Sequence, residues 1–114
     1  KWIAFILNQI LQNSLKYRRE TGAMIRIYTQ RRARGVCLAV EDNGIGIRQE
    51  EIPRIFEKNF TGTNGRIHGR STGMGLYLCA KLCGKLGIGI GAESQERVGT
   101  KIMLEFPAGT FHMR

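Results

Sequence analysis

The spacing of apolar residues at the start of the chain constrains the fold most strongly. Within residues 2–18 the apolar side chains recur at steps of three and four: Ile3, Ile6, Leu7, Ile10, Leu11 and Leu15. This period predicts an amphipathic helix with one buried face, which Gly22 ends. A helix with one apolar face needs a second layer of structure to cover it.

Short apolar segments later in the chain supply that layer. Four of them have the length and composition of strands: residues 24–29, 36–40, 88–93 and 101–106. The first two predict an antiparallel hairpin around the basic turn 30–35, and the last two predict a second pair. A short helix with Pro53 near its start and a longer helix over 74–86 lie between the pairs. The order predicts an α+β fold, a two-layer α/β sandwich whose mixed, mostly antiparallel sheet is covered on one face by helices.

One segment fits neither layer. Residues 58–73 include several glycines and hydroxyl residues but almost no large apolar side chain. Glycine makes up 15 of the 114 residues, about twice its ordinary share. A structureless loop of this length is uncommon in a compact domain unless it is functional. A chain of 114 residues has room for one core, so we expect a single domain with a functional loop.

Charge and cysteine content limit the classes of partner and site. The net charge of +9 favours an anionic partner, which could be nucleic acid, an acidic membrane surface or the phosphates of a nucleotide. Cys79 and Cys83 lie four residues apart on the predicted helix over 74–86, but without two further ligands they make a poor zinc site, so we expect core packing. The longest apolar stretch, residues 3–7, is far shorter than the ~20 residues that span a bilayer.

Polar residues share one face of the first predicted helix. Gln9, Asn13, Lys16 and Tyr17 stand at positions that project along the same side. An amide oxygen beside a lysine suits a hydrated Mg²⁺ and the phosphates that it neutralises, because Mg²⁺ prefers oxygen ligands and keeps several waters. The same pattern is also typical of an ordinary exposed helix face, so taken alone it leaves both interpretations open.

Two glycine motifs are candidates for a nucleotide site. In Asp42-Asn43-Gly44-Ile45-Gly46, the carboxylate at a strand end can accept a hydrogen bond from an exocyclic amine such as that of adenine, and the glycines let a flat base approach. Such a sequence is also a common turn. In Gly73-Met74-Gly75-Leu76, glycines at the start of a helix leave N–H groups open to an anion.

In this order, the motifs resemble those of the catalytic ATP-binding domain of bacterial sensor histidine kinases, within the GHKL ATPase superfamily and its Bergerat fold. Five segments carry the resemblance: residues 8–17 (N box), 42–46 (first glycine box), 56–60 (F box), 73–76 (second glycine box) and 99–100 (terminal glycine motif). Residues 60–66 and 71–78 look most like the small kinases that sense bacitracin and other antimicrobial peptides. Asn59 departs from the pattern, since such kinases usually have glycine there.

The resemblance implies an adenine pocket and a phosphate site. Asp42 would accept a hydrogen bond from the adenine amine, Gly44 and Gly46 would admit the ring, and Thr100 would support the adenine edge. Tyr17 would lie against the nucleotide.

On the phosphate side, the resemblance implies that Asn13 coordinates the Mg²⁺ that bridges the phosphates and that Lys16 contacts phosphate. The backbone of Gly73, Met74, Gly75 and Leu76 would present N–H groups to the phosphates. Residues 58–72 would form a long flexible ATP lid, in which Arg70 is a candidate phosphate contact. The implied ligands are ATP and Mg²⁺.

The choice among related activities depends on a general base. Gyrase, heat-shock chaperone and mismatch-repair ATPases resemble one another in using a glutamate on the first helix to activate water, whereas this chain has Gln9 one turn before Asn13 and no acid in its first nineteen residues. An amide cannot take that proton. We therefore expect a histidine kinase that donates the γ-phosphoryl group to a histidine outside the chain, because His68 and His112 have neither the helix nor the adjacent acid expected of an acceptor. Alternatives are a GHKL-type ATPase, an anti-sigma-type protein-serine kinase and, less favoured, a basic nucleic-acid-binding module.

The resemblance covers nearly the whole chain, so residues 1–114 are expected to form one catalytic domain. The dimerisation and phosphoacceptor domain and the membrane sensor domain of such kinases are expected to lie outside it, and the isolated domain would be a monomer that does not label itself. Expected partners are that dimerisation domain and, through the full-length kinase, a response regulator. The resemblance implies a cytosolic domain of a bacterial, membrane-anchored, homodimeric kinase.

Overall fold

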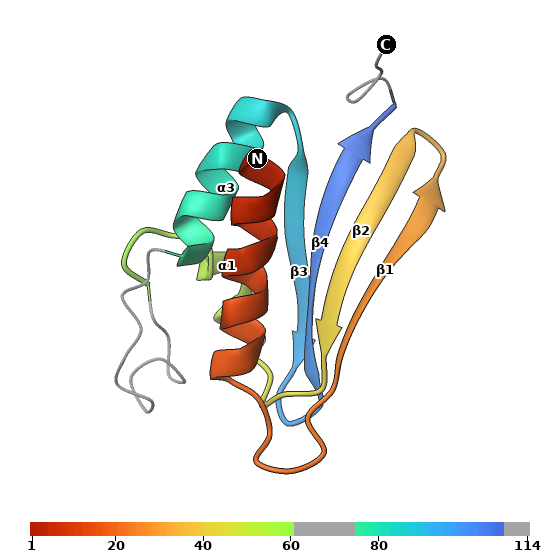
Figure 1. The fold of residues 1–114 in the computed structure, drawn as a ribbon. Helices are drawn as coiled ribbons and strands as arrows, with labels where there is room; N and C mark the ends of the chain where they lie inside the picture. The colour runs from red at the N-terminus through yellow and green to blue at the C-terminus, as the bar shows by residue number, and fades with distance from the viewer. Residues whose placement is uncertain (61–74, 109–114) are drawn as a thin grey trace.

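The computed structural model describes residues 1–60 and 75–108. The helices and strands follow one another along the chain in the predicted order (Figure 1). The elements are α1 (Trp2–Lys16), β1 (Ile25–Arg32), β2 (Gly35–Asp42), the 3₁₀-helix η1 (Ile52–Arg54), α3 (Gly75–Leu86), β3 (Gly89–Gln95) and β4 (Gly99–Pro107). None of the helices in these residues is long and apolar enough to cross a membrane.

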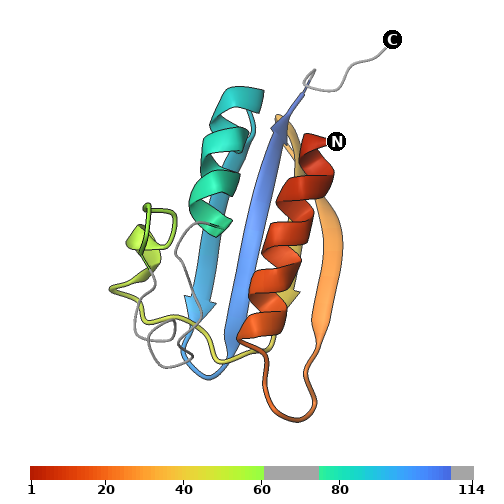
Figure 2. The ribbon, with the colours of Figure 1, turned by 60° about the vertical axis from the view of Figure 1, so that its left-hand side comes forward.

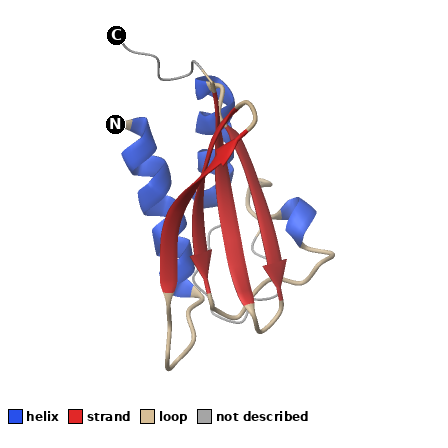
Figure 3. Cartoon of the chain, turned by 90° about the vertical axis from the view of Figure 1, so that its right-hand side faces the viewer, coloured by secondary structure: helices blue, strands red, loops and turns tan. Residues whose placement is uncertain are grey.

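The four strands form one sheet in the order β1-β2-β4-β3. Every strand pair is antiparallel in the described residues. Helices α1 and α3 lie on one face of the sheet, as Figures 1 and 2 show, and the view of the opposite face in Figure 3 shows no helix in front of the strands. The predicted α+β architecture with helices on one face is confirmed.

The first hairpin is longer than predicted. The sequence predicts a turn over residues 30–35, whereas β1 continues through Arg32 and β2 begins at Gly35, so the turn is Ala33 and Arg34. The strands continue because the antiparallel pairing extends to Arg32 opposite Gly35. Gly35 also lies tightly against β4, since a Cβ at that position would be 2.0 Å from the carbonyl oxygen of Phe106.

The core lies between the helices and the sheet. Its most buried side chains come from α1, α3, β2 and β4: Ile6, Ile10, Cys79, Cys83, Val40, Ile102 and Leu104. Burial raises the pKa of the Cys79 thiol to about 12, and the Sγ of Cys79 donates to the carbonyl oxygen of Ile6 over 3.7 Å. The two thiols of α3 therefore pack in the core as predicted, in a form that is protonated and unreactive at neutral pH.

Gly87 and Asn59 have backbone angles in the left-handed region, which explains the residue types found at these positions. Gly87 has φ +74° and follows α3, where Ile88 N donates to the carbonyl oxygen of Cys83 over 2.9 Å. This is the Schellman ending of a helix, which favours glycine. Asn59 has φ +64°, a conformation that asparagine tolerates better than most residues. The departure from glycine at residue 59 therefore keeps the backbone conformation that glycine would allow.

Candidate functional site

One end of the sheet gathers most of the described candidate residues. Helix α1 ends there, β2 ends there at Asp42, and β4 begins there at Gly99 (Figure 1). In the sheet register Asp42 lies opposite Thr100, and Thr100 lies opposite Ser94 on β3. Because directly opposed residues in antiparallel strands point to the same face, these three side chains share the face that the helices cover.

The carboxylate of Asp42 is held by two backbone groups. Its Oδ1 accepts hydrogen bonds from Gly44 N at 2.9 Å and from Thr100 N at 3.3 Å. Among the described residues, none donates a hydrogen bond to Oδ2 of Asp42. The half-buried side chain is therefore oriented by its own loop and by β4, with one oxygen left to accept a hydrogen bond from a ligand.

The loop that follows Asp42 is anchored to the end of α1. Ile45 N donates to the carbonyl oxygen of Tyr17 over 3.1 Å. A Cβ on Gly44 would lie 2.5 Å from that same oxygen and 3.0 Å from Oδ1 of Asp42. Glycine at residue 44 is thus required for the loop to reach both α1 and the Asp42 carboxylate.

The same loop is anchored to the turn between β3 and β4. Arg97 N donates to the carbonyl oxygen of Ile45 over 2.7 Å. Gly46 has φ +76° and is buried, and a Cβ there would lie 2.1 Å from the carbonyl oxygen of Gln95. The predicted freedom of Gly44 and Gly46 serves two close backbone approaches within the protein, which hold the loop in place beside Asp42.

Two residues beside the candidate site, Asn43 and Ser94, were not identified from the sequence as site candidates. Asn43 joins the loop to the segment before β1, because its Oδ1 accepts from Met24 N at 2.8 Å and its Nδ2 donates to the carbonyl oxygen of Gly22 at 2.9 Å. Ser94 lies beside Thr100, with 2.8 Å between their hydroxyl oxygens. The signal for Ser94 is a hydroxyl residue placed opposite Thr100, and only the register of β3 on β4 shows that placement.

A second group of candidate residues lies between the helices. A Cβ on Gly75, the first residue of α3, would lie 3.0 Å from Oε1 of Gln9 on α1. Gln9, Asn13 and Lys16 are half-buried, and Nζ of Lys16 lies 5.8 Å from the centre of the Tyr17 ring. The amide of Gln9 is thus beside the N-terminus of α3, the end of a helix that attracts anions.

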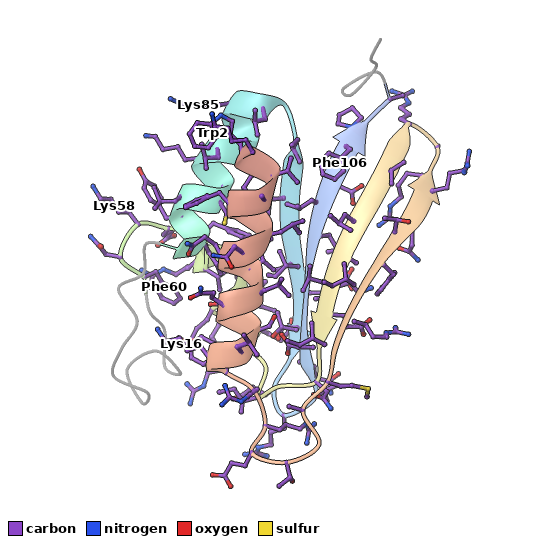
Figure 4. The ribbon with its side chains drawn as sticks, viewed as in Figure 1. Trp2, Lys16, Lys58, Phe60, Lys85 and Phe106 are labelled. Atoms are coloured by element: carbon purple, nitrogen blue, oxygen red, sulfur yellow. The ribbon has the colours of Figure 1, made fainter. Side chains whose placement is uncertain are left out.

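Figure 4 shows Lys16 projecting from the lower end of α1 on the side where Phe60 lies. Phe60 packs under the guanidinium of Arg54, whose Cζ lies 4.5 Å from the ring centre. Leu76, on the first turn of α3, is half-buried and packs against the core. Arg70, Gly73, Met74 and both histidines lie outside the described residues, as does the predicted lid beyond Phe60.

A cavity of about 510 Å³ lies at this end of the sheet, and its lining includes Asp42, Ser94 and Thr100 as well as Arg26, Glu41, Glu93 and Lys101. Its cations have acidic partners, since Arg26 pairs with Glu41 at 3.0 Å and Lys101 with Glu93 at 3.7 Å. The Arg26 guanidinium also lies 5.0 Å from the centre of the Tyr28 ring. Acids interleaved with the bases in this way disfavour a nucleic-acid interface, which needs unpaired cations and open aromatic faces.

Hydrogen bonds lower the pKa of Glu41, with the one from Arg26 having the largest effect and the one from Tyr28 the next largest. The Arg26 pKa is correspondingly raised by its hydrogen bond with Glu41. Both side chains are substantially exposed, so the pair contributes little to stability. The cavity is therefore lined both by this solvated, charge-paired surface and by Asp42, Ser94 and Thr100 at the end of the sheet.

Solved structures with the same fold come from histidine kinases. The mycobacterial sensor histidine kinase MprB is 21% identical, with a TM-score of 0.78 over 93% of this chain and 70% of that chain. The catalytic domain of histidine kinase ThkA, in a nucleotide-free form, is 27% identical, with a TM-score of 0.74 over 93% of this chain and 67% of that chain. The first of these likenesses shows the fold alone.

Curated relatives are sensor kinases. The sensor histidine kinase GraS of Staphylococcus haemolyticus and the sensor protein BceS of Bacillus subtilis are each 42% identical over 107 residues, which is 94% of this chain. The chain spans about a third of the length of these relatives, 30% of GraS and 31% of BceS. The model of histidine kinase-, DNA gyrase B- and HSP90-like ATPases matches residues 1–110. This match agrees with the sequence motifs of the chain and with its helix-covered antiparallel sheet. The chain belongs to the family of histidine kinase-, DNA gyrase B- and HSP90-like ATPases.

Proposed function

We propose that this chain binds Mg²⁺-ATP and donates the γ-phosphoryl group to a histidine on a separate dimerisation domain of its parent two-component sensor kinase. The observation that carries the proposal is the Asp42 carboxylate, held through Oδ1 at the helix-covered end of the sheet. The similarity to the sensor histidine kinase GraS and the sensor protein BceS supports the histidine-kinase branch of the family.

Asp42 is suited to select adenine. A carboxylate only accepts hydrogen bonds, so it pairs with the exocyclic amine of adenine and repels the carbonyl group that guanine has at the same position. Gly44 and Gly46 let the loop pack closely against the backbone of Tyr17 and Gln95, and Gly44 N donates the hydrogen bond that orients the Asp42 carboxylate. A flat base would donate its amine to the other oxygen of this carboxylate, with Tyr17 and Thr100 at its borders.

The phosphates would lie toward the helices. Asn13 and Lys16 supply an amide oxygen and a cation near the end of α1, and Gly75 and Leu76 begin α3. Outside the described residues, Arg70, Gly73 and Met74 would complete this side. Backbone N–H groups at a helix start and a lysine together match the charge of a triphosphate.

Mg²⁺ fits the donors that this end of α1 offers. The described residues hold no cluster of three His, Cys, Asp or Glu side chains that would cage a metal by themselves. One amide oxygen, that of Asn13, suits an ion that keeps several waters and takes its other ligands from phosphate. When bound, Mg²⁺ neutralises charge on the phosphates; Asn13 would hold it, and Lys16 would add a second positive charge.

The absence of a general base on α1 favours transfer to an external nucleophile over hydrolysis. In the first nineteen residues no side chain is Asp or Glu, and beside the N-terminus of α3 stands the amide of Gln9. An amide cannot accept the proton of an attacking water. The chain would position ATP and stabilise charge, while the attacking imidazole comes from elsewhere, in agreement with how phosphoryl transfer is catalysed.

The partners follow from the separation of ATP binding, on this chain, from the acceptor histidine, on another domain. The phosphoacceptor would be the parent's own dimerisation domain, and a response regulator would receive the phosphoryl group from the full-length kinase. We place the chain on the cytosolic side of a membrane-anchored, homodimeric bacterial kinase, because that is where ATP and a response regulator are available.

A titration with a fluorescent ATP analogue, with and without Mg²⁺, tests the adenine site. Asp42→Asn replaces an acceptor oxygen by a donor and is expected to weaken binding by about 10- to 100-fold. Glu105→Gln, at the other end of β4 and outside the lining of this cavity, is the matched control and should bind as the wild type does. Unchanged binding in Asp42→Asn would remove the adenine assignment.

Transfer is tested with γ-labelled ATP. The chain alone should incorporate no label, whereas the chain mixed with the separately produced dimerisation domain of its parent should place acid-labile label on that domain. Label on the chain itself, or rapid release of phosphate without transfer, would contradict the proposal.

A further inference from the structure

A hydroxyl network behind Asp42 centres on Ser94. The Oγ of Ser94 lies 2.8 Å from Ile47 N, 2.8 Å from the carbonyl oxygen of Gly99 and 2.8 Å from Oγ1 of Thr100. These three atoms come from the loop after Asp42 and from the start of β4. Ser94 therefore joins both segments that hold the Asp42 carboxylate.

The proton positions in this network follow from the chemistry of each group. A carbonyl oxygen only accepts, so the single proton of Ser94 is donated to Gly99. A backbone N–H only donates, so Ser94 accepts from Ile47. The remaining contact, between the two hydroxyl groups, then has one arrangement: Thr100 donates its proton to Ser94.

This arrangement leaves Thr100 as an acceptor toward the site. When the Thr100 hydroxyl group donates to Ser94, its Oγ1 can take part in further hydrogen bonds only as an acceptor, through its two lone pairs. Thr100 is only 8% exposed, so bulk water does not compete freely for its hydroxyl group. Thr100 stands opposite Asp42 in the register, and the two side chains thus present acceptor atoms on the same face.

We propose that Ser94 is a positioning residue for nucleotide specificity: by accepting a hydrogen bond from the Thr100 hydroxyl group, it makes Thr100 a second acceptor beside Asp42, so that the pocket favours a purine carrying an amino group at its edge. The inference rests on the proposed function, because it assigns the nucleotide to the face that Asp42 and Thr100 share. Ser94 need not touch the base, since it acts through the orientation of the Thr100 hydroxyl group.

The test compares two ligands that differ at that edge. Inosine triphosphate has a carbonyl oxygen where ATP has the amino group, and competition titrations against the fluorescent ATP analogue measure both dissociation constants. The wild-type chain should prefer ATP. In Ser94→Ala the Thr100 hydroxyl is free to turn and donate, so the preference for ATP over inosine triphosphate should narrow by about fivefold.

Two further variants separate positioning from a structural role. Ser94→Thr keeps the hydroxyl group and should retain the wild-type preference. Thr100→Val removes the acceptor with little change of shape and should narrow the preference, and Ser94→Ala added to Thr100→Val should narrow it no further. If Ser94→Ala does not fold, Ser94→Cys takes its place: it keeps a side chain of similar size but accepts a hydrogen bond only weakly, so it should also narrow the preference for ATP.

Equal weakening of ATP and inosine triphosphate in Ser94→Ala would overturn the inference, because a merely structural role lowers both affinities alike. A further narrowing in the double variant would also overturn it, since Ser94 would then act other than through Thr100. Failure of the wild-type chain to bind ATP would overturn the proposed function itself, which distinguishes that outcome from an unchanged ratio in Ser94→Ala.

Discussion

Gly46 lies so close to Gln95 that a Cβ at residue 46 would be 2.1 Å from the carbonyl oxygen of Gln95. The contact joins the loop after Asp42 to the last residue of β3, and Gly46 adopts φ +76° to make it. Both features disfavour a side chain at residue 46, so glycine is needed there for the shape of the loop that follows Asp42.

Gly46→Ala should therefore lower the free energy of unfolding by at least about 2 kcal/mol, through left-handed strain and the clash with Gln95. Urea unfolding followed by circular dichroism measures the change. Gly91→Ala is the control, because a Cβ at residue 91 meets nothing within 4 Å. A Gly46→Ala variant as stable as the control variant would contradict the close approach.

Gly84 and Gly87 form a matched pair near the end of α3. A Cβ at either position meets nothing within 4 Å, but Gly87 alone has a positive φ, +74°. Gly84→Ala should raise stability by about 0.5 kcal/mol, because alanine favours the helix. Gly87→Ala should lower it by about 1 kcal/mol, because a Cβ disfavours the left-handed conformation. Thermal unfolding of the two variants should shift in opposite directions, and shifts of the same sign would count against the Schellman ending.

Gln9→Glu tests the missing base. It places a carboxylate beside the N-terminus of α3, where the amide of Gln9 now stands. Phosphate release at saturating Mg²⁺-ATP should rise by at least about tenfold, because a carboxylate can accept the proton of an attacking water. Gln9→Ala, which supplies no base, should release phosphate as slowly as the wild type. Equal rates in all three proteins would show that residue 9 does not reach the attacking water.

Glu41 predicts a pH dependence of stability. Hydrogen bonds from Arg26 and Tyr28 lower its pKa in the folded chain, so its contribution is present above the unfolded-state pKa and is lost as the pH falls through the lower, folded value. At pH 7, Glu41→Gln should cost a few tenths of a kcal/mol, about the value of an exposed pair. The difference from wild type should shrink in acid and in high salt. If the difference in free energy of unfolding between wild type and Glu41→Gln grew as the pH fell, the lowered pKa of Glu41 would be contradicted.

The local elements of the fold were predictable because their signals are local. The three- and four-residue spacing in α1 and the apolar strand segments specify which face is buried, whatever the partner. The strand ends were not predictable in the same way. β1 runs on through the polar residues Gln30, Arg31 and Arg32 because β2 supplies hydrogen-bond partners for them, and no property of those residues favours a strand.

In the candidate site, too, some features depend on local sequence and others on strand pairing. By itself, the sequence determined the helix periods, the strand-end carboxylate of Asp42, the glycines around it and the lack of an acid on α1, since each depends on residue type and spacing. Only the tertiary structure decided that Gly44 and Gly46 meet the backbone of Tyr17 and Gln95, and that the hydroxyl groups of Ser94 and Thr100 lie within hydrogen-bonding distance. Those relationships depend on which strands pair and in which register, and that is decided by packing among segments far apart in the chain.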